Sequence, residues 1–287
     1  MHSHRISFLI LISIFISATW QPALAQQPLF KVAVAEEVQA MVDANSRIKI
    51  SRAHGKRSVA PYEYADCKSL RSVEIDEGIT SIGEYAFLGC ENLESIKLPS
   101  TLRKIGEGAF RECPNLKSLV IPEGVKVIPA YMCEWDSGLE SVTLPESVAD
   151  ISRGAFAYCY SLGRINLPKG LTHIGPNAFS YCKSLEEVSV PDSMKELESY
   201  AFSGCESLRK AKLPANSHML GEMIFTGCRN LKEITCMSTL PPTFDCGTPL
   251  FDPLETELWN QCVLKVPYES LPLYEDATGW NFFKKYD

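Results

Sequence analysis

Apolar residues recur along this chain every 23 residues. One column is always leucine and comprises Leu70, Leu93, Leu116, Leu139, Leu162, Leu185, Leu208 and Leu231. Most units continue as L-x-x-I-x-L, and in six of them a proline follows. Alternating inward and outward positions are typical of a short strand, which proline ends because it has no backbone N–H to donate. The pattern therefore predicts one short parallel strand per repeat, starting near residues 71–76.

The second half of each unit carries further apolar positions in the segment I-G-x-x-A-F. Its phenylalanines are Phe87, Phe110, Phe156, Phe179, Phe202 and Phe225. We expect this segment to return the chain as irregular or short helical structure, with Ile and Phe filling the interior. No single unit can bury these side chains, so stacked neighbours must form the core. A period of 20–29 residues with this pattern is typical of the leucine-rich-repeat solenoid, an α/β superhelix-like fold.

The N-terminal end departs from the repeat. Residues 1–25 combine Arg5, an apolar run over 6–20 and the small-residue site Ala23-Leu24-Ala25. This combination predicts a cleaved export signal, with a signal anchor as the alternative. Residues 26–58 are interpreted as an N-terminal cap that includes an amphipathic helix at 32–44, and the repeats are expected at 59–240.

The C-terminal end is expected to close the solenoid as a cap over 241–287. The segment Leu264-Lys265-Val266-Pro267 resembles one more strand of the repeat, and we expect large apolar side chains after it to cover the core: Tyr274, Trp280, Phe282 and Phe283. The sequence thus predicts one elongated domain with two caps.

Composition and charge limit the partners. Loss of Arg5 with the signal leaves 27 of the 28 Lys and Arg against 35 Asp and Glu, a net charge of −8. An acidic balance argues against nucleic acid or an anionic membrane as the main partner. No other stretch has the length and apolarity of a transmembrane segment. We expect an exported monomer in the periplasm, on the cell surface or in the medium.

Eleven cysteines in an exported chain first suggest disulfides. Stacked residues would lie about one strand spacing apart, ~4.8 Å, but with parallel side-chain vectors that suit a disulfide poorly. We therefore expect buried, reduced thiols at the seven cysteines that share one column: Cys67, Cys90, Cys113, Cys159, Cys182, Cys205 and Cys228. Outside the column, a bridge within Cys236, Cys246 and Cys262 is left open.

One unit breaks the columns. Asp136 stands where the other units have cysteine, and Cys133 stands where they have phenylalanine. We expect the neighbouring Trp135 to fill the space that the missing phenylalanine leaves.

These columns resemble the BspA-like leucine-rich repeats of bacterial surface and secreted proteins, of the treponemal 23-residue type. The shared motif is C-x-x-L-x-x-I-x-L-P-x-x-L-x-x-I-G-x-x-A-F, which residues 90–110 match. The resemblance covers residues 59–240, and the closing segment is similar to the C-terminal end of that family. It implies a solenoid without the asparagine ladder of common leucine-rich repeats. It also implies binding to host proteins or other cells.

Candidate catalytic and metal sites are scarce. After removal of the signal the histidines are His54, His173 and His218, and no H-E-x-x-H, G-x-S-x-G or C-x-x-C motif is present. His173 lies in a column expected to face solvent and is interpreted as a surface residue. The acidic segment 244–260 matches no EF-hand and is interpreted as a loop rather than a cation site. We expect no enzyme activity, no metal and no cofactor.

The outward positions of the predicted strands form three columns. The first two, which begin at Arg71 and Ser72, alternate in charge for most of their length, and such cross-strand pairs stabilise a sheet by about 0.2–1 kcal/mol each. The third column lacks this alternation and is the better candidate for partner contact, through Lys97, Val120, Thr143, Asn166, Ser189 and Lys212. Near one end, positive charge that could attract an acidic protein or an anionic glycan gathers at Arg209, Lys210, Lys212 and Lys232.

Two function classes remain. The sequence favours a secreted or cell-surface binding module whose solenoid face binds a protein or a glycan, as in adhesion or host interaction. The alternative is a structural or assembly component of the bacterial cell envelope.

Overall fold

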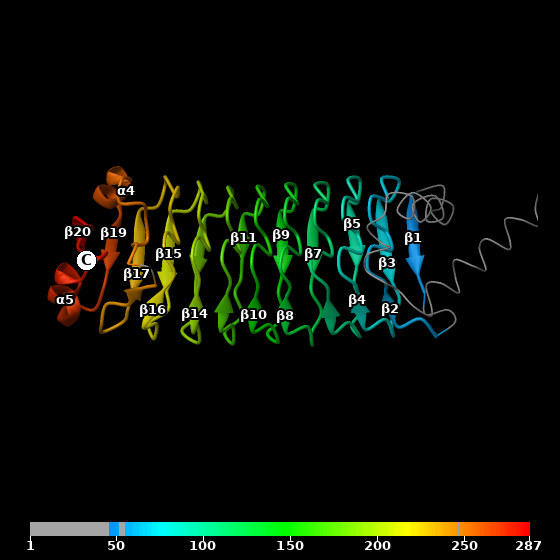
Figure 1. Ribbon diagram of the computed structural model, residues 1–287, viewed down its shortest axis with the longest axis horizontal. Coiled ribbons are helices and arrows are strands. Elements are labelled where there is room, and N and C mark those ends of the chain that lie inside the picture. Colours follow the sequence, from blue (N-terminus) through cyan, green and yellow to red (C-terminus); the bar gives the residue numbers. More distant parts are fainter. Residues whose placement is uncertain (1–45, 52–54, 246) are drawn as a thin grey trace, which may run out of the picture.

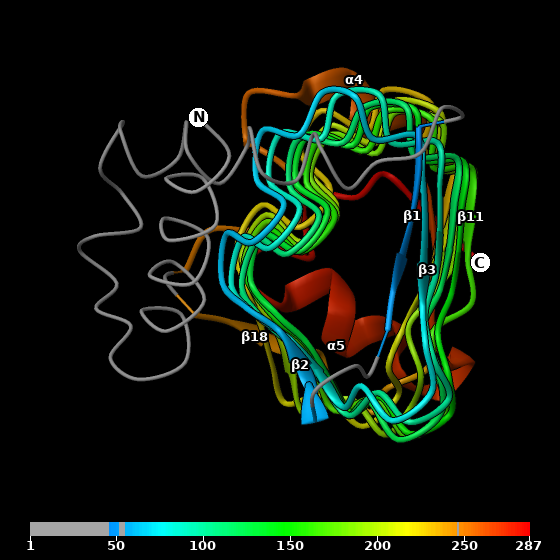
Figure 2. The same cartoon turned by 90° about the vertical axis from the view of Figure 1, so that its right-hand side faces the viewer.

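The computed structural model describes residues 46–51, 55–245 and 247–287. The expected export signal, the expected helix at 32–44, His54 and Cys246 therefore lie outside the described residues. The described chain winds into an elongated solenoid whose rungs follow one another in sequence order (Figure 1). Along the axis the rungs superimpose as a ring of nearly constant outline (Figure 2). The predicted solenoid of stacked parallel strands is confirmed.

The longer strands of successive rungs form one side of this ring (Figure 2). They pair in parallel, and the register between neighbouring repeats is 23 residues, as in Ser72↔Ser95 and Lys210↔Glu233. The predicted strand positions are confirmed by β3 (Ser72–Ile75), β5 (Ser95–Lys97), β7 (Ser118–Val120), β9 (Ser141–Thr143), β11 (Arg164–Ile165), β13 (Glu187–Ser189), β15 (Lys210–Leu213) and β17 (Glu233–Cys236).

A second series of two-residue strands forms another side of the ring. These strands are β2 (Ser58–Val59), β4 (Ser81–Ile82), β6 (Lys104–Ile105), β8 (Val127–Ile128), β10 (Asp150–Ile151), β12 (His173–Ile174), β14 (Glu196–Leu197), β16 (Met219–Leu220) and β18 (Thr243–Phe244). The prediction of one strand per repeat is therefore wrong. In each repeat the aliphatic residue of the I-G segment and the residue before it form a second, two-residue strand, which pairs with the equivalent strand of the next rung. Strands and turns take the place of helical returns between residues 55 and 245.

The G-x-x-A-F arc that completes each rung is also bonded to the next rung. Tyr85 N donates to Glu107 O at 2.7 Å, and Phe87 N donates to Ala109 O at 2.8 Å. Tyr85 has a φ of 51°, and its ring leans over Gly108, where an added Cβ would lie 2.3 Å from the ring. A side chain at Gly108 would therefore require the tyrosine to move. Backbone hydrogen bonds thus connect the rungs along the arc as well as along the strands.

The core consists of columns in which each side chain packs on its counterpart one rung away. Phe179 is fully buried, and its ring stacks on Phe156 and Phe202 with centroids 5.3 and 5.2 Å apart. The leucine column from Leu70 to Leu231 is 0% exposed in every rung. The columns read from the sequence are the columns of the core.

The cysteine column is buried and unbridged, as predicted. From Cys90 onward each of its thiols donates to a backbone carbonyl of the preceding rung, as Cys182 Sγ does to Phe156 O at 3.3 Å. Burial raises the pKa of the Cys182 thiol, which keeps it protonated and able to donate. Cys236 and Cys262 are also unbridged, and Cys236 Sγ lies 3.3 Å from the Tyr274 hydroxyl oxygen.

The irregular unit, which contains Cys133, Trp135 and Asp136, packs differently from our expectation. Trp135 is 41% exposed and stacks on Tyr158 with centroids 3.9 Å apart, so it does not fill the core. It faces outward because its column, two residues after the phenylalanine column, lies on the outside of the arc. Cys133 is buried at the phenylalanine position instead, and Asp136 is completely buried at the cysteine position.

The Asp136 carboxyl group is only partly satisfied. Its Oδ1 accepts a hydrogen bond from Cys113 N at 2.7 Å, whereas Oδ2 is buried without a partner among the described residues. Burial raises the pKa of Asp136 well above its ordinary value. The burial of this side chain therefore disfavours its charged form.

Additional strands extend the ladder at both ends. β1 (Arg47–Ile50) pairs with β3, so the strand ladder already begins within the stretch interpreted as an N-terminal cap. β19 (Val263–Lys265) pairs with β17, which confirms the strand expected near Leu264, and β20 (Lys285–Tyr286) pairs with β19.

Helices and aromatic side chains cover the C-terminal end of the core. The helical elements are α4 (Thr256–Gln261), the 3-10 helix η2 (Tyr268–Ser270) and α5 (Leu271–Asp276), which lies across the end of the ring in Figure 2. Tyr274, Trp280 and Phe283 are buried as expected, and Trp280 Nε1 donates to Pro242 O at 2.7 Å. Phe282, expected in the core, is 38% exposed and packs on Trp259, because Phe283 takes the inward direction.

Phe179→Ala should lower the free energy of unfolding by about 3–5 kcal/mol, because it leaves a cavity between two packed rings. Urea denaturation followed by circular dichroism measures this. Val120→Ala, at a side chain that is 61% exposed, is the matched control and should stay within about 0.5 kcal/mol of the wild type. Equal effects of the two changes would contradict the stacked core.

The column cysteines should resist alkylation by iodoacetamide in the native protein and react fully after denaturation. Burial removes these thiols from the reagent, and it raises the pKa of the Cys182 thiol, so that little thiolate is available there. Peptide mass mapping gives the modified sites. Bridges between consecutive column cysteines, or rapid labelling of Cys182, would be inconsistent with the structure.

Asp136→Asn should stabilise the protein by an amount that grows with pH. The unfolded carboxyl group has a pKa of about 3.9, and the native pKa is raised, so the native state keeps a proton that the unfolded state releases. Between these two pKa values the contribution of Asp136 to stability falls as pH rises. Asparagine stays neutral and keeps the acceptor for Cys113 N. Urea unfolding of both proteins at several pH values tests this, and a pH-independent difference would contradict it.

Candidate functional site

The outer face of the long-strand sheet holds the residues singled out in the sequence. Side chains alternate along each strand, so that Leu119 points into the core while Ser118 and Val120 point outward. Lys212 is half-buried, and the other candidate residues on this face are exposed: Lys97, Val120, Thr143, Asn166, Ser189, Arg209, Lys210 and Lys232. They lie on or directly beside the long strands of successive rungs and form one extended surface.

Charge pairing along the first outward column is confirmed. Arg71 pairs with Glu94, and Lys117 Nζ lies 3.6 Å from Glu140 Oε1. These pairs are more than half exposed, so each contributes little to stability on its own, about 0–1 kcal/mol. Their regular spacing nevertheless favours the native register over shifted ones.

The third column contains ion pairs that the sequence did not indicate. Lys97 Nζ lies 3.0 Å from Glu74 Oε1, and these two residues are register partners within this column. Lys212 Nζ lies 3.3 Å from Asp192 Oδ2, which belongs to the turn of the preceding rung. The expectation that this column has no pairing role is therefore wrong for both lysines. The remaining candidate residues of this column are uncharged: Val120, Thr143, Asn166 and Ser189.

The positive cluster near β15 is flanked by acidic side chains. Lys210 has Glu187 and Glu233 as its register partners on the two neighbouring strands. Lys232 Nζ donates to Gln261 Oε1 at 2.7 Å, so it faces the C-terminal cap. The lysines are thus adjacent as predicted, but their charge is partly compensated by their neighbours.

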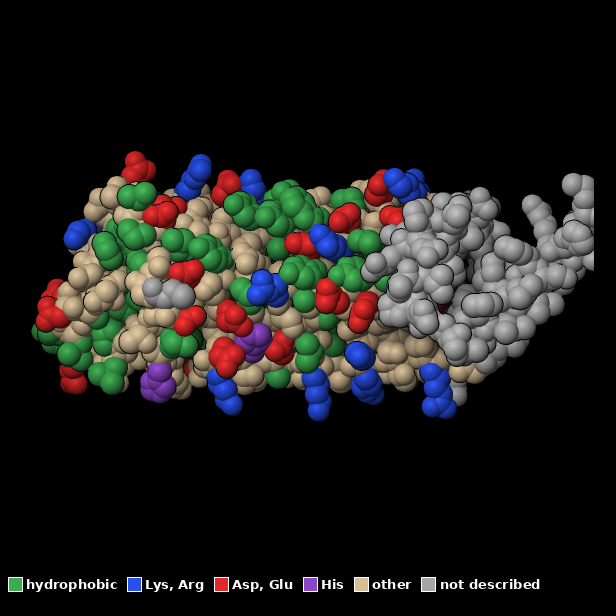
Figure 3. Space-filling view, viewed as in Figure 1, with side chains coloured by type: hydrophobic (Ala, Val, Ile, Leu, Met, Phe, Trp, Pro, Cys, Tyr) green, Lys and Arg blue, Asp and Glu red, His purple; other side chains and the backbone are tan. Residues whose placement is uncertain are grey.

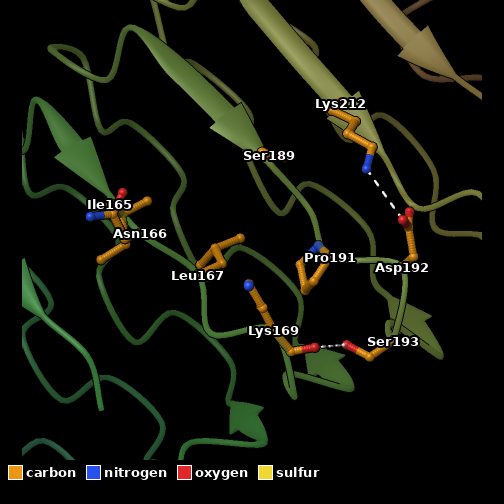
Figure 4. Close-up of a pocket in the computed structure, with 9 residues that line it drawn as sticks. All are labelled: Ile165, Asn166, Leu167, Lys169, Ser189, Pro191, Asp192, Ser193 and Lys212. Atoms are coloured by element: carbon orange, nitrogen blue, oxygen red, sulfur yellow. Dashed lines mark hydrogen bonds and ion pairs between the residues drawn. The ribbon is translucent and has the colours of Figure 1, made fainter. Parts of the chain in front are cut away.

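A hollow of about 520 Å³ opens beside the sheet where its ladder is interrupted. β11 ends at Ile165, and the next hydrogen-bonded group of long strands begins with β13. Three third-column residues, Asn166, Ser189 and Lys212, line the hollow (Figure 4). The sequence placed these residues in one column, and the structure shows that they also share a concave surface.

The turns after β11 and β13 supply the rest of this hollow. Leu167 and Pro191 give it an apolar floor, while Lys169, Asp192 and Ser193 give it polar groups (Figure 4). Asp192 Oδ1 accepts a hydrogen bond from Ala215 N at 3.0 Å, and this bond, with Lys212 nearby, holds the pKa of Asp192 below its ordinary value. Sequence reasoning missed the turn residues because it considered only the strand columns.

His173 lies at an outward position of β12, as the sequence indicated, although its side chain is not fully exposed. Its ring is half-buried on the short-strand side of the solenoid, with Nδ1 2.7 Å from Asp150 Oδ2 and Nε2 2.6 Å from Glu198 Oε1. Burial lowers the pKa of His173, but the hydrogen bonds to Glu198 and Asp150 and their negative charges outweigh it, so that the pKa is raised.

The acidic segment 244–260 has a structural role at one of its members. Glu255 accepts hydrogen bonds from Thr226 Oγ1 and Gly227 N, both at 2.8 Å, and so ties the cap to the last regular arc.

A second exposed surface consists of aromatic side chains on the arcs. Tyr158 stacks between Trp135 and Tyr181, and Tyr160 meets Trp135 and Tyr158 edge-on. The space-filling view shows hydrophobic side chains interspersed with charged ones on the face toward the viewer (Figure 3). Because the stacked rings cover one another, this surface offers ring edges and hydroxyl groups rather than open ring faces.

The comparisons with known proteins identify the repeat. The family model of the BspA type leucine rich repeat region matches residues 57–183 and 150–243, with six copies. The chain belongs to this family. The resemblance stated from the motif is thereby confirmed. No curated protein matches the chain.

Solved structures of bacterial leucine-rich-repeat proteins are similar to this BspA-type chain. A leucine-rich repeat protein from Bacteroides ovatus is 25% identical, with a TM-score of 0.55 over 78% of this chain and 67% of that one. The Treponema pallidum leucine rich repeat protein is 27% identical, with a TM-score of 0.47 over 65% of this chain and 78% of that one. Within the described residues, no helix has the length and apolarity needed to cross a membrane.

Proposed function

We propose that this BspA-type protein is a secreted or cell-surface binding module that holds a protein or a glycan on the outer face of its long-strand sheet. The hollow at β11, β13 and β15 is the observation that carries the proposal, since it gathers three candidate contact residues in one concavity. Its volume lies within the range of about 300–1,000 Å³ that is common for ligand sites.

The chemistry of the hollow suits a polar partner surface. Asn166 offers an amide, Ser189 offers a hydroxyl group and Lys169 offers an ammonium group. The ammonium of Lys212 is already engaged by Asp192, and the Ser193 hydroxyl is engaged by backbone carbonyls. Such groups match the hydroxyls of a sugar or the backbone of an extended peptide, while Leu167 and Pro191 offer apolar contact. Steering by net positive charge is a smaller contribution than the sequence suggested, because acidic residues flank the lysines.

A binding role is favoured over a catalytic one by the residues that line the hollow. Ser193 Oγ donates to Lys169 O and Leu171 O, both at 2.7 Å, rather than to a general base, so this hydroxyl is not activated as a nucleophile.

Ser189→Tyr should weaken binding at least about tenfold, because the ring would occupy the hollow. Ser189 is exposed on a strand, where tyrosine is well tolerated, so the melting temperature should not change. Binding of the purified protein to an array of defined glycans and to decellularised mammalian matrix measures the effect.

Ser118→Tyr is the matched control, because it puts the same ring on an exposed serine of β7, on the same face but outside the hollow. It should bind as the wild type does. Full binding by Ser189→Tyr would contradict the proposal, and association of the wild type only with itself or with bacterial envelope would favour the structural alternative.

A further inference from the structure

The short-strand sheet brings together four side chains that the repeat does not require. Asp150, His173 and Glu196 are register partners on β10, β12 and β14, so they form a row across three consecutive rungs. Glu198 follows two residues after Glu196 and joins the row from the same rung. This cluster lies on a different face from the hollow of the binding proposal and is independent of it.

Glu198 occupies a position at which the repeat favours glycine. The same column holds Gly83, Gly106, Gly175 and Gly221, and its other members are Pro129 and Ser152. At Gly221 an added Cβ would lie 2.2 Å from Ser199 N, which shows how closely the backbone of the preceding rung approaches this column. Glu198 N still donates to Ile174 O at 2.9 Å, so the ladder is kept. Packing alone gives no reason for a carboxylate here.

The hydrogen bonds orient the imidazole as in a metal site. Asp150 Oδ2 accepts from Nδ1, and Asp150 is itself held by Ser152 Oγ, which donates to Oδ1 at 2.7 Å. A carboxylate on Nδ1 leaves Nε2 as the basic nitrogen, the arrangement that second-shell carboxylates impose on metal-binding histidines. Without an ion, Nε2 donates to Glu198 Oε1. A cation bound at Nε2 would displace that proton into solvent, and Glu198 would change from hydrogen-bond acceptor to ligand.

The donor atoms are close enough to share one ion. A ring nitrogen of His173 and one carboxylate oxygen from each of Glu196 and Glu198 lie within 4.8 Å of one another. Ligands around Zn²⁺ are roughly 3.5 Å apart, given bonds of about 2.1 Å. The Glu198 carboxylate, 2.6 Å from Nε2, would therefore have to rotate away from the ring to admit the ion. Beside the donor atoms opens a cavity of about 230 Å³, lined also by Lys195 and Asp245, with room for water ligands.

We propose that His173, Glu196 and Glu198 bind one divalent transition-metal ion, Zn²⁺ fitting best, with Asp150 as the positioning residue. One nitrogen and two carboxylates leave open coordination positions for water or for a group of a partner. The nitrogen donor favours such an ion over Ca²⁺ and Mg²⁺, which prefer oxygen ligands throughout.

Isothermal titration calorimetry of the tag-free, EDTA-treated protein with Zn²⁺ tests the site. The wild type should bind one ion per chain. His173→Gln and Glu198→Gln should each weaken this binding at least about tenfold, and Asp150→Asn by about 10–100-fold through loss of orientation. His218→Gln is the matched control, since His218 is exposed and outside the cluster, and it should bind as the wild type does.

A spectroscopic measurement makes the result independent of any folding defect in a variant. In wild-type protein labelled with ¹⁵N-histidine, Zn²⁺ should shift the Nε2 resonance of His173 while Nδ1 stays protonated. Absence of saturable binding in the wild type, equal affinity in His173→Gln, or an unshifted His173 resonance at saturating Zn²⁺ would each overturn the proposal. Neither result bears on ligand binding at the long-strand sheet.

Discussion

Backbone hydrogen bonds between successive rungs decide which side chains meet in this protein. They run along both series of strands and along the arc, as from Phe179 N to Ala201 O, so a residue packs against its counterpart about 23 positions away. Stacked rings, thiols that donate across rungs and pairs of opposite charge all depend on this register. A shift of one residue would move the inward side chains of the strands to the outside and would separate the other core columns from their counterparts.

The fold could be predicted from the sequence because the 23-residue spacing of the columns equals the register between rungs. The strand positions, the buried cysteines and the burial of Tyr274, Trp280 and Phe283 all follow from the periodicity and from the burial of apolar groups. The second strand of each repeat was not predicted, since a strand of two residues has too little alternation to distinguish it from a turn. The direction of Trp135 was missed for a related reason, because the periodicity does not show which positions of an arc point inward.

The functional surfaces were harder to predict because their contacts run diagonally between columns. Lys212 meets Asp192 20 residues earlier, and His173 meets Glu198 25 residues later, so neither pair shares a column. The hollow likewise combines strand positions with turn positions such as Pro191 and Ser193. One signal was available in the sequence: between positions 83 and 221, Glu198 is the single charged residue in a column that otherwise holds glycine, proline or serine.

The hollow and the His173 cluster lie on different faces of the same group of rungs. Each rung contributes about 4.8 Å to the length of the rod and contacts only its neighbours. Duplication or loss of a whole 23-residue unit elsewhere would therefore change the reach of the molecule by that step and leave both surfaces intact. The span of such a rod and the chemistry that it carries can thus evolve separately.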